Sequence, residues 1–187
     1  IHIEPLNKPA YLHFNFHPSV VAPNQRGAMI VTFDAPKRND YGYNYDNIML
    51  SVNGTKDFRN RITITANITE DFSKLTDQEL ANAPTVEFTA KELSFGEIIQ
   101  GEKAHCDFIV KNTGKRPLFI RKTKASCGCT AVTIGNKAVQ PGKSTTIRAT
   151  FDSTGRSGKQ YKTITVITND PKHPETTLRI RGNIKVR

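Results

Sequence analysis

The stretch that decides the fold is residues 140–152, Gln-Pro-Gly-Lys-Ser-Thr-Thr-Ile-Arg-Ala-Thr-Phe-Asp. A Pro-Gly turn leads into an alternating segment, in which Ile147, Ala149 and Phe151 share one face and polar residues occupy the other. Successive side chains of a strand point to opposite faces of its sheet. The pattern therefore predicts a β-strand with one buried face and one solvated face.

The same pattern occurs 118 residues earlier, in residues 22–34. Both copies begin with a proline-containing turn and end in Thr-Phe-Asp. Two further segments repeat with an offset of 116 residues, namely 45–54 with 161–170 and 61–68 with 177–184. Three strands in the same order, with similar turns, predict two copies of one domain.

Short strands with one polar face occupy most of residues 85–187, and turn signals such as Asn-Thr-Gly and Asn-Asp-Pro separate them. About seven such strands in about 100 residues are typical of an antiparallel immunoglobulin-type β-sandwich. Residues 71–84 are the helical candidate, because Thr76 and Glu79 have the spacing of a capping box. We predict an all-β chain of tandem immunoglobulin-like β-sandwiches with a short helical linker. Its parts are an N-terminally incomplete sandwich at 1–69, the linker at 70–84, and a basic sandwich at 85–187.

The first sandwich is predicted to lack its opening strands. The second begins near residue 85, and the repeat offset places the equivalent start about 33 residues before Ile1. We expect the counterpart of the strand at Lys103–Asn112 to be missing, which would open the edge of the strand at Ala28–Phe33. An open edge is a template for strand addition. We expect cover from residues 1–3, from the second domain, or from a strand of another molecule. The last case would be a strand-complemented dimer, and the intact parent protein could also supply the strands.

The charge of the chain is uneven. Residues 1–84 carry 8 Lys and Arg against 9 Asp and Glu, whereas residues 85–187 carry 19 against 8. A basic half can attract polyanions, although a solvated lysine face gives the same pattern. Aromatic residues are not interleaved with the basic ones, so we expect no nucleic-acid partner. No apolar run approaches the roughly 20 residues of a membrane helix, so any membrane association would be peripheral.

The motif Cys127-Gly128-Cys129 is the one chemically suggestive feature, and three interpretations stay open. In an extended strand both sulfurs would point the same way and could bind a soft metal, with either His105 or Cys106 as a further ligand. A bend at Gly128 would instead permit a disulfide or a redox pair. The third interpretation is a tight turn in which Gly128 supplies an unusual dihedral and the sulfurs fill space. The first copy has Lys-Pro-Ala-Tyr at residues 8–11, so the fold does not demand cysteines here.

The third cysteine, Cys106, alternates with apolar residues in the strand at Lys103–Asn112, which predicts a buried thiol without a disulfide. The sequence contains no nucleophile elbow, phosphate-binding loop, carboxylate pair or metal-type histidine spacing. We therefore predict no catalytic residue and no bound cofactor. We also predict no metal site beyond the candidate ligands Cys127, Cys129 and His105.

Several segments of the second domain occur together, in the order of a known family. They are 95–98 (Phe-Gly-Glu-Ile), 110–114 (Val-Lys-Asn-Thr-Gly), 126–130 (Ser-Cys-Gly-Cys-Thr), 140–143 (Gln-Pro-Gly-Lys) and 169–171 (Asn-Asp-Pro). On these segments the domain resembles a bacterial family of envelope-associated immunoglobulin-like domains of unknown function, in the Hydin and major-sperm-protein branch. The resemblance implies a periplasmic or cell-surface location. It supplies no established activity.

These patterns lead us to expect a non-enzymatic protein of the bacterial envelope. It would act as a structural spacer or as a binding module for a protein or a glycan, because sandwiches bind through end loops and exposed edge strands. Thiol-redox chemistry or soft-metal handling through Cys127 and Cys129 is the alternative. Polyanion binding by the basic second domain is a further one.

Overall fold

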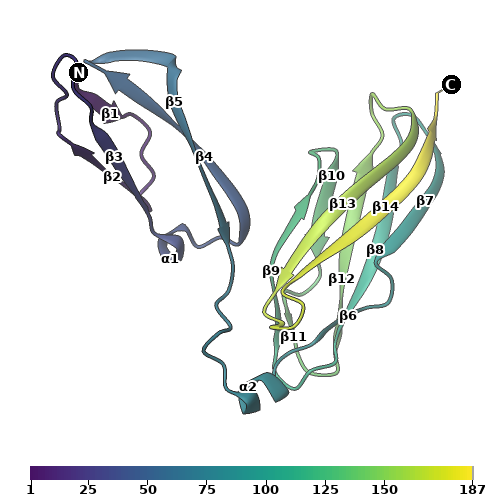
Figure 1. Cartoon of the computed structure of the whole chain (residues 1–187). Coiled ribbons are helices and arrows are strands. Elements are labelled where there is room, and N and C mark those ends of the chain that lie inside the picture. Colours follow the sequence, from purple (N-terminus) through teal and green to yellow (C-terminus); the bar gives the residue numbers. More distant parts are fainter. Residues whose placement is uncertain (187) are drawn as a thin grey trace. The chain divides into compact units, whose positions relative to one another are not determined.

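The computed structural model describes residues 1–186 and consists mostly of β-strands (Figure 1). The chain divides into two units, Ile1–Thr69 and a second that begins at Glu70, here called unit 1 and unit 2. Each unit has two sheets. This confirms the predicted fold class, an all-β chain of tandem immunoglobulin-like sandwiches with a short helical linker.

Unit 2 is a full sandwich of two sheets, ordered β10-β12-β8-β6 and β11-β9-β13-β14-β7. Its strands are β6 (Val86–Phe88), β7 (Glu92–Ile99), β8 (Lys103–Asn112), β9 (Leu118–Ala125), β10 (Thr130–Ile134), β11 (Ala138–Val139), β12 (Ser144–Asp152), β13 (Gly158–Thr168) and β14 (Glu175–Lys185). The prediction of an antiparallel sandwich is wrong at one edge. There β7 does not belong to the sheet of β6 and β8; it pairs with β14 in the other sheet and runs parallel to it.

The core of unit 2 lies between these sheets and follows the period-2 alternation of its strands. In β12 the side chains of Ile147, Ala149 and Phe151 are 0% exposed. The strand β8 pairs with β12 over nine residues and adds its own inward row, which includes Cys106 and Phe108. Both rows are buried because β8 covers the edge of β12.

Unit 1 is built from fewer strands. They are β1 (Ile3–Pro5), β2 (Leu12–His17), β3 (Ala28–Phe33), β4 (Gly42–Val52) and β5 (Thr55–Ile68), with the one-turn helix α1 (Ala35–Arg38) after β3. The sheets are β2-β3 and β1-β4-β5. By order and pairing, these strands correspond to β10 and β12 in one sheet and to β9, β13 and β14 in the other.

The predicted repeat is visible in backbone hydrogen bonds that recur at an offset of 118 residues. In unit 2, Thr130 N–H donates to the Cys127 carbonyl at 3.3 Å, and in unit 1 the equivalent Leu12 N–H donates to the Pro9 carbonyl at 3.0 Å. Likewise, Asp152 N–H donates to the Cys129 carbonyl, and the equivalent Asp34 N–H donates to the Tyr11 carbonyl, both at 2.9 Å. The same turn therefore forms in both units, with and without cysteines.

Within the described residues, unit 1 has no counterpart of β6, β7 or β8. We expected the missing strands to open the edge of β3. The position of β7 in unit 2 adds to this, because a missing β7 counterpart also opens the edge of β5. The outer strand β5 accordingly keeps Ile62 and Ile64 only half-buried, whereas the equivalent Leu178 and Ile180 of β14 are fully buried.

The consequence is clearest on β3. Its inward residues Met29, Val31 and Phe33 are only half-buried, although the equivalent row of β12 is fully buried. Ile30, on the outward face of β3, is 53% exposed. Residues 1–3 fold back, since Ile3 pairs with Val52 of β4, but they leave the edge of β3 unpaired.

The linker contains the predicted helix, α2 (Asp77–Ala81). Its capping box is present: the Thr76 hydroxyl accepts a hydrogen bond from Glu79 N–H at 3.3 Å, and the Glu79 carboxylate accepts one from Thr76 N–H at 2.9 Å. These bonds satisfy N–H groups that a helix start leaves without partners. In the part of the chain that is described, no helix is long and apolar enough to cross a membrane.

Equivalent truncations should differ in cost between the two units. We expect Ile147→Ala to lower the free energy of unfolding of unit 2 by about 2–5 kcal/mol, because a fully buried side chain leaves a cavity. Met29→Ala should cost unit 1 less than half as much, because Met29 is already half-exposed. Urea titration followed by hydrogen-exchange mass spectrometry assigns each transition to its unit. Equal losses would show that β3 is covered as fully as β12.

Candidate functional site

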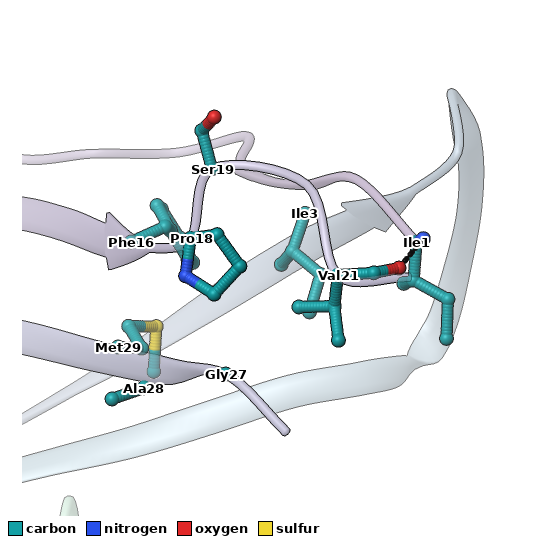
Figure 2. Close-up of a pocket in the computed structure, with 9 residues that line it drawn as sticks. All are labelled: Ile1, Ile3, Phe16, Pro18, Ser19, Val21, Gly27, Ala28 and Met29. Carbon is teal, nitrogen blue, oxygen red and sulfur yellow. Dashed lines mark hydrogen bonds between the residues drawn. The ribbon is translucent and has the colours of Figure 1, made fainter. Parts of the chain in front are cut away.

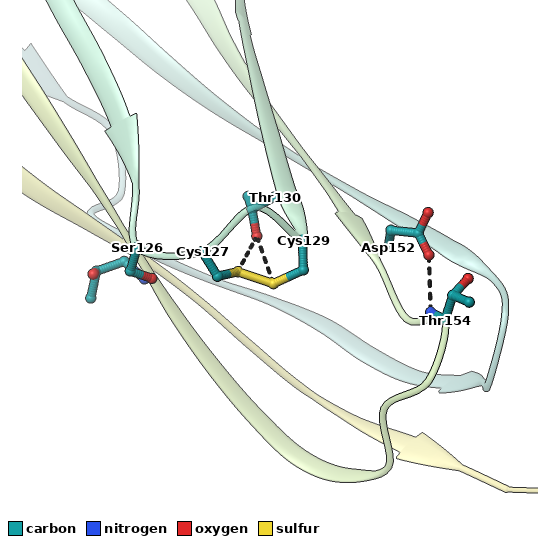
Figure 3. The surroundings of a disulfide bond; sticks show 7 residues. Ser126, Cys127, Cys129, Thr130, Asp152 and Thr154 are labelled. Carbon is teal, nitrogen blue, oxygen red and sulfur yellow. Dashed lines mark hydrogen bonds between the residues drawn. A yellow bond between two sulfur atoms is a disulfide. The ribbon is translucent and has the colours of Figure 1, made fainter. Parts of the chain in front are cut away.

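The Cys127-Gly128-Cys129 segment forms the turn between β9 and β10, and its two sulfurs are joined in a disulfide (Figure 3). The two Cα atoms are 5.2 Å apart. Residues i and i+2 of an extended strand would be about 6.6 Å apart, near the upper limit for a disulfide. The turn thus supplies the bend that a disulfide requires, and the extended arrangement expected for metal binding is not adopted.

Gly128 does not play the expected conformational part. Its φ angle lies outside the left-handed region, so the prediction of an unusual dihedral is wrong. A Cβ at this position would meet no atom within 4 Å, and the residue is exposed. The glycine therefore leaves the outer side of the disulfide without a covering side chain.

The other motif residues hold this turn in place. Ser126 donates its N–H to the Thr163 carbonyl at 2.9 Å, and its hydroxyl accepts the Thr163 N–H at 3.1 Å. The hydroxyl of the buried Thr130 lies 3.7 Å from Cys127 Sγ and 3.9 Å from Cys129 Sγ. The motif Ser-Cys-Gly-Cys-Thr is thus a disulfide turn that is fixed to β13 on one side and to the core on the other.

Asp152 lies beside this turn at the end of β12. Its N–H donates to the Cys129 carbonyl at 2.9 Å, and its carboxylate accepts the Thr154 N–H at 2.9 Å. Hydrogen bonds from the Thr154 hydroxyl and N–H lower the pKa of the Asp152 carboxyl group. The carboxylate is therefore ionised at neutral pH, and it caps the loop that follows β12.

Both motif cysteines are half-buried, and Cys129 packs against the core of unit 2. His105 lies on the exposed face of β8, where its Nδ1 is 3.0 Å from the Thr150 hydroxyl. It does not join the cysteines: among the residues described, no group of three or more His, Cys, Asp or Glu side chains could hold a metal ion. The redox interpretation of Cys127 and Cys129 stays a prediction.

Cys106 is buried and unpaired, as predicted. It is 5% exposed on the inward face of β8. Burial raises the pKa of its thiol, and the neighbouring charge of Asp107 adds to this effect. The thiol is therefore protonated at neutral pH and inert towards alkylation while the sandwich is folded.

The polar residues in the other motif segments support loops. Asn112 donates its side-chain amide to the carbonyls of Arg116 at 2.8 Å and Val139 at 2.9 Å. Its Oδ1 accepts the Gly114 N–H at 3.0 Å. Buried polar groups need hydrogen-bond partners, and the side chain of Asn112 supplies them to three backbone groups. This explains why the Asn-Thr-Gly turn begins with asparagine.

Asp170 plays the same part in the turn between β13 and β14. Its carboxylate is fully buried and accepts the N–H groups of Val86 at 2.9 Å, Lys172 at 2.8 Å and His173 at 3.3 Å. The bond to Val86 ties β6 to the loop before β14. Asn112 and Asp170 are thus engaged in holding the backbone of unit 2.

Unit 1 contains an apolar cavity at one end of its open sandwich, with a volume of about 270 Å³ (Figure 2). The hydroxyl of Ser19 points away from the other lining side chains in this view. The lining residues are Ile1, Ile3, Phe16, Pro18, Ser19, Val21, Gly27, Ala28 and Met29.

Sequence reasoning missed this cavity. The repeat predicted an open edge on β3, but the cavity depends on how the loop at residues 18–27 closes against β1. Residues 22–27 of that loop match residues 140–145 of the second copy, but strand alternation does not show how a loop closes. The available signal was the apolar residue Val21 in a loop beside a predicted open edge.

Two immunoglobulin-like sandwiches, one complete and one open, define the class of the protein. The chain belongs to the family of proteins of unknown function DUF1573, whose model matches residues 86–184. That match covers the complete sandwich of unit 2. A search of curated proteins gave no match.

The chain is also similar in fold to solved structures. A protein of unknown function from Porphyromonas gingivalis W83 shares 15% identity, with 97% of this chain and 83% of that chain covered at a TM-score of 0.66. The PapD-like domain 7 of human CEP192 shares 11% identity, with 65% and 98% covered at a TM-score of 0.47. At these identities the likeness concerns the fold alone.

The disulfide makes a simple prediction for thiol counts. Without reductant, denatured protein should present one reactive thiol per chain, that of Cys106, and reduction should raise the number to three. Folded protein at pH 8 should present none, because burial raises the pKa of Cys106 and blocks access. Mass spectrometry after alkylation gives these numbers. Three thiols in unreduced, denatured protein would mean that the turn does not hold a disulfide.

Proposed function

We propose that this chain is a non-enzymatic protein of the bacterial envelope that binds another protein through unit 1. Unit 2 serves as the closed, supporting sandwich. One observation carries the proposal: the inward row of β3 is half-buried, whereas the equivalent row of β12 is fully buried. An open strand edge beside incompletely covered apolar residues is the arrangement through which sandwiches bind other chains.

The energetics favour cover for this face. Burial of apolar surface contributes about 25 cal/mol per Å², so each side chain that a partner covers adds to binding. The surface includes Ile30, which is 53% exposed, and the cavity that Met29 lines. Unit 1 buries only Leu12, Ile48 and Leu50 as its apolar core, so a partner would also stabilise the unit itself.

A location in the periplasm or on the cell surface is part of the proposal. The Cys127–Cys129 disulfide supports it, because disulfides persist in oxidising compartments and are rare in the bacterial cytosol. We also retain the proposed relation to the Hydin and major-sperm-protein branch of sandwiches, which rests on the motif segments of the second domain.

Thiol–disulfide exchange at Cys127 and Cys129 is a second candidate function. It is favoured because unit 1 forms the same turn without cysteines, so the disulfide is not needed for the fold. A dithiol reductant would convert the disulfide to two thiols and itself become a disulfide. We give polyanion binding less weight because four basic side chains of unit 2 pair with carboxylates and aromatic residues are not interleaved with the basic ones. The pairs are Arg148–Asp107, Lys103–Asp152, Arg181–Glu92 and Lys185–Glu97.

Site-specific photocrosslinking in cells of the source organism tests the main proposal. A benzophenone side chain is placed at Ile30 of β3, and the matched control places it at Ile109, which is exposed on the outward face of the covered strand β8. We expect a defined protein adduct from position 30 and none from position 109. Equal labelling at both positions, or no adduct, would contradict a protein-binding role of unit 1.

A further inference from the structure

We propose that the Cys127–Cys129 disulfide of unit 2 accepts two electrons from a protein dithiol. The dithiol attacks the sulfur of Cys127, and the hydroxyl of Thr130 stabilises the departing sulfur of Cys129. This inference rests on the second candidate function, thiol–disulfide exchange, and adds the substrate class and the part that each residue plays. All reacting groups of the chain belong to unit 2, so the open edge of unit 1 has no part in it.

The turn that holds the disulfide is maintained by other bonds. The disulfide links residues only two apart in sequence, and a disulfide restricts the unfolded chain least when it closes a short loop. The backbone hydrogen bonds of the turn also form in unit 1, where Pro9 and Tyr11 stand in place of the cysteines. Ser126 adds two hydrogen bonds to Thr163 of β13. Reduction therefore removes one covalent bond and leaves the hydrogen bonds of the turn in place.

The outer side of the disulfide is accessible to a thiolate. Gly128 is exposed, and a Cβ at its position would meet no atom from the rest of the described chain within 4 Å. Cys129 is among the described side chains that pack against the core of unit 2, whereas Cys127 is not. Exchange rates depend on access to the sulfur that is attacked. We therefore assign Cys127 as the attacked sulfur and Cys129 as the leaving group.

The hydroxyl of Thr130 is placed to stabilise the leaving sulfur. It lies 3.9 Å from Cys129 Sγ and 3.7 Å from Cys127 Sγ (Figure 3). Neither sulfur of a disulfide carries a proton, so the hydroxyl is the donor in both contacts. A hydrogen bond donated to a thiolate favours the charged form. The carboxylate of Asp152 accepts the Thr154 N–H instead and points away from the sulfurs (Figure 3).

The exchange takes place in two steps. A thiolate of the partner attacks Cys127 Sγ, the new S–S bond forms as the Cys127–Cys129 bond breaks, and Cys129 leaves as a thiolate that takes a proton from water. The partner's second thiol loses its proton to water and attacks the partner's own sulfur in the mixed disulfide. Cys127 then leaves as a thiolate and is protonated. Unit 2 thus gains two electrons and two protons, and the partner becomes a disulfide.

Thioredoxin without its resolving cysteine is the probe for the attacked sulfur. Mixed with the oxidised full chain, it should form a mixed disulfide. Quenching in acid stops exchange between the two sulfurs, and peptide mapping by mass spectrometry then locates the bond. We expect it at Cys127 at least tenfold more often than at Cys129.

The variant Gly128→Leu tests access from the outer side. A leucine fits there without backbone strain, because the φ angle of Gly128 lies outside the left-handed region. Its side chain should slow reduction by intact thioredoxin at least tenfold, because a protein must approach the turn closely. Reduction by the small reagent dithiothreitol is the control and should change less than threefold. An equal change with both reductants would contradict docking of a protein on this side.

The variant Thr130→Val tests the hydroxyl. We expect it to slow reduction by thioredoxin at least fivefold, and Thr130→Ser, which keeps the hydroxyl, to restore the rate. The matched control is Thr145→Val near the start of β12, because Thr145 is also buried and its hydroxyl accepts the Asn136 N–H. This control should leave the rate within twofold. Equal slowing in both valine variants would mean that Thr130 acts only through the stability of unit 2.

The remaining outcomes separate this inference from the candidate function on which it rests. Reduction should leave amide hydrogen exchange of unit 2 unchanged outside residues 126–130, and loss of protection across the sandwich would overturn the inference. A bond found mainly at Cys129 would overturn it as well. If dithiothreitol alone reduces the folded chain, the protein dithiol is wrong but exchange remains. If neither reductant does so, the second candidate function is also wrong. The crosslink from position 30 reports on unit 1 in either case.

Discussion

The pairing of β8 with β12 is the interaction on which the sandwich depends. In unit 2 it covers an edge, satisfies one side of the β12 backbone, and places a second apolar row against Ile147, Ala149 and Phe151. Unit 1 has the same turn, the same strand order and the equivalent inward positions, yet no strand in the described part of the chain makes this pairing. The open edge of β3 and the partial burial of its inward row follow from that single difference.

Comparison of the two units also shows which features the fold requires and which are additional to it. The turn before β2 and the turn before β10 share the same backbone hydrogen bonds, although only the latter contains cysteines. Asn112 and Asp170, by contrast, are engaged in backbone hydrogen bonds that hold loops. The disulfide turn of unit 2 and the open face of unit 1 are therefore the two features that the architecture leaves for function.

Much of this could be predicted from the sequence, because period-2 alternation and a repeat report directly on burial and strand order. Cys106 was predicted as a buried free thiol from its place among alternating apolar residues, and Thr76 and Glu79 predicted the capping box. The parallel placement of β7 could not be predicted, because alternation shows which face is buried and not which sheet a strand joins. The prediction of an unusual dihedral at Gly128 was wrong for a related reason, since glycine permits such dihedrals without requiring them.

Amide hydrogen exchange resolved to single residues tests the central claim most directly. The inward rows of β3 and β12 are equivalent in sequence position, so the two strands serve as each other's control. If β3 has an open edge, the amides of β3 that do not bond to β2 should exchange on the order of 100-fold faster than the amides of β12, which is paired on both sides. Equal protection of β3 and β12 in the free protein would contradict the account.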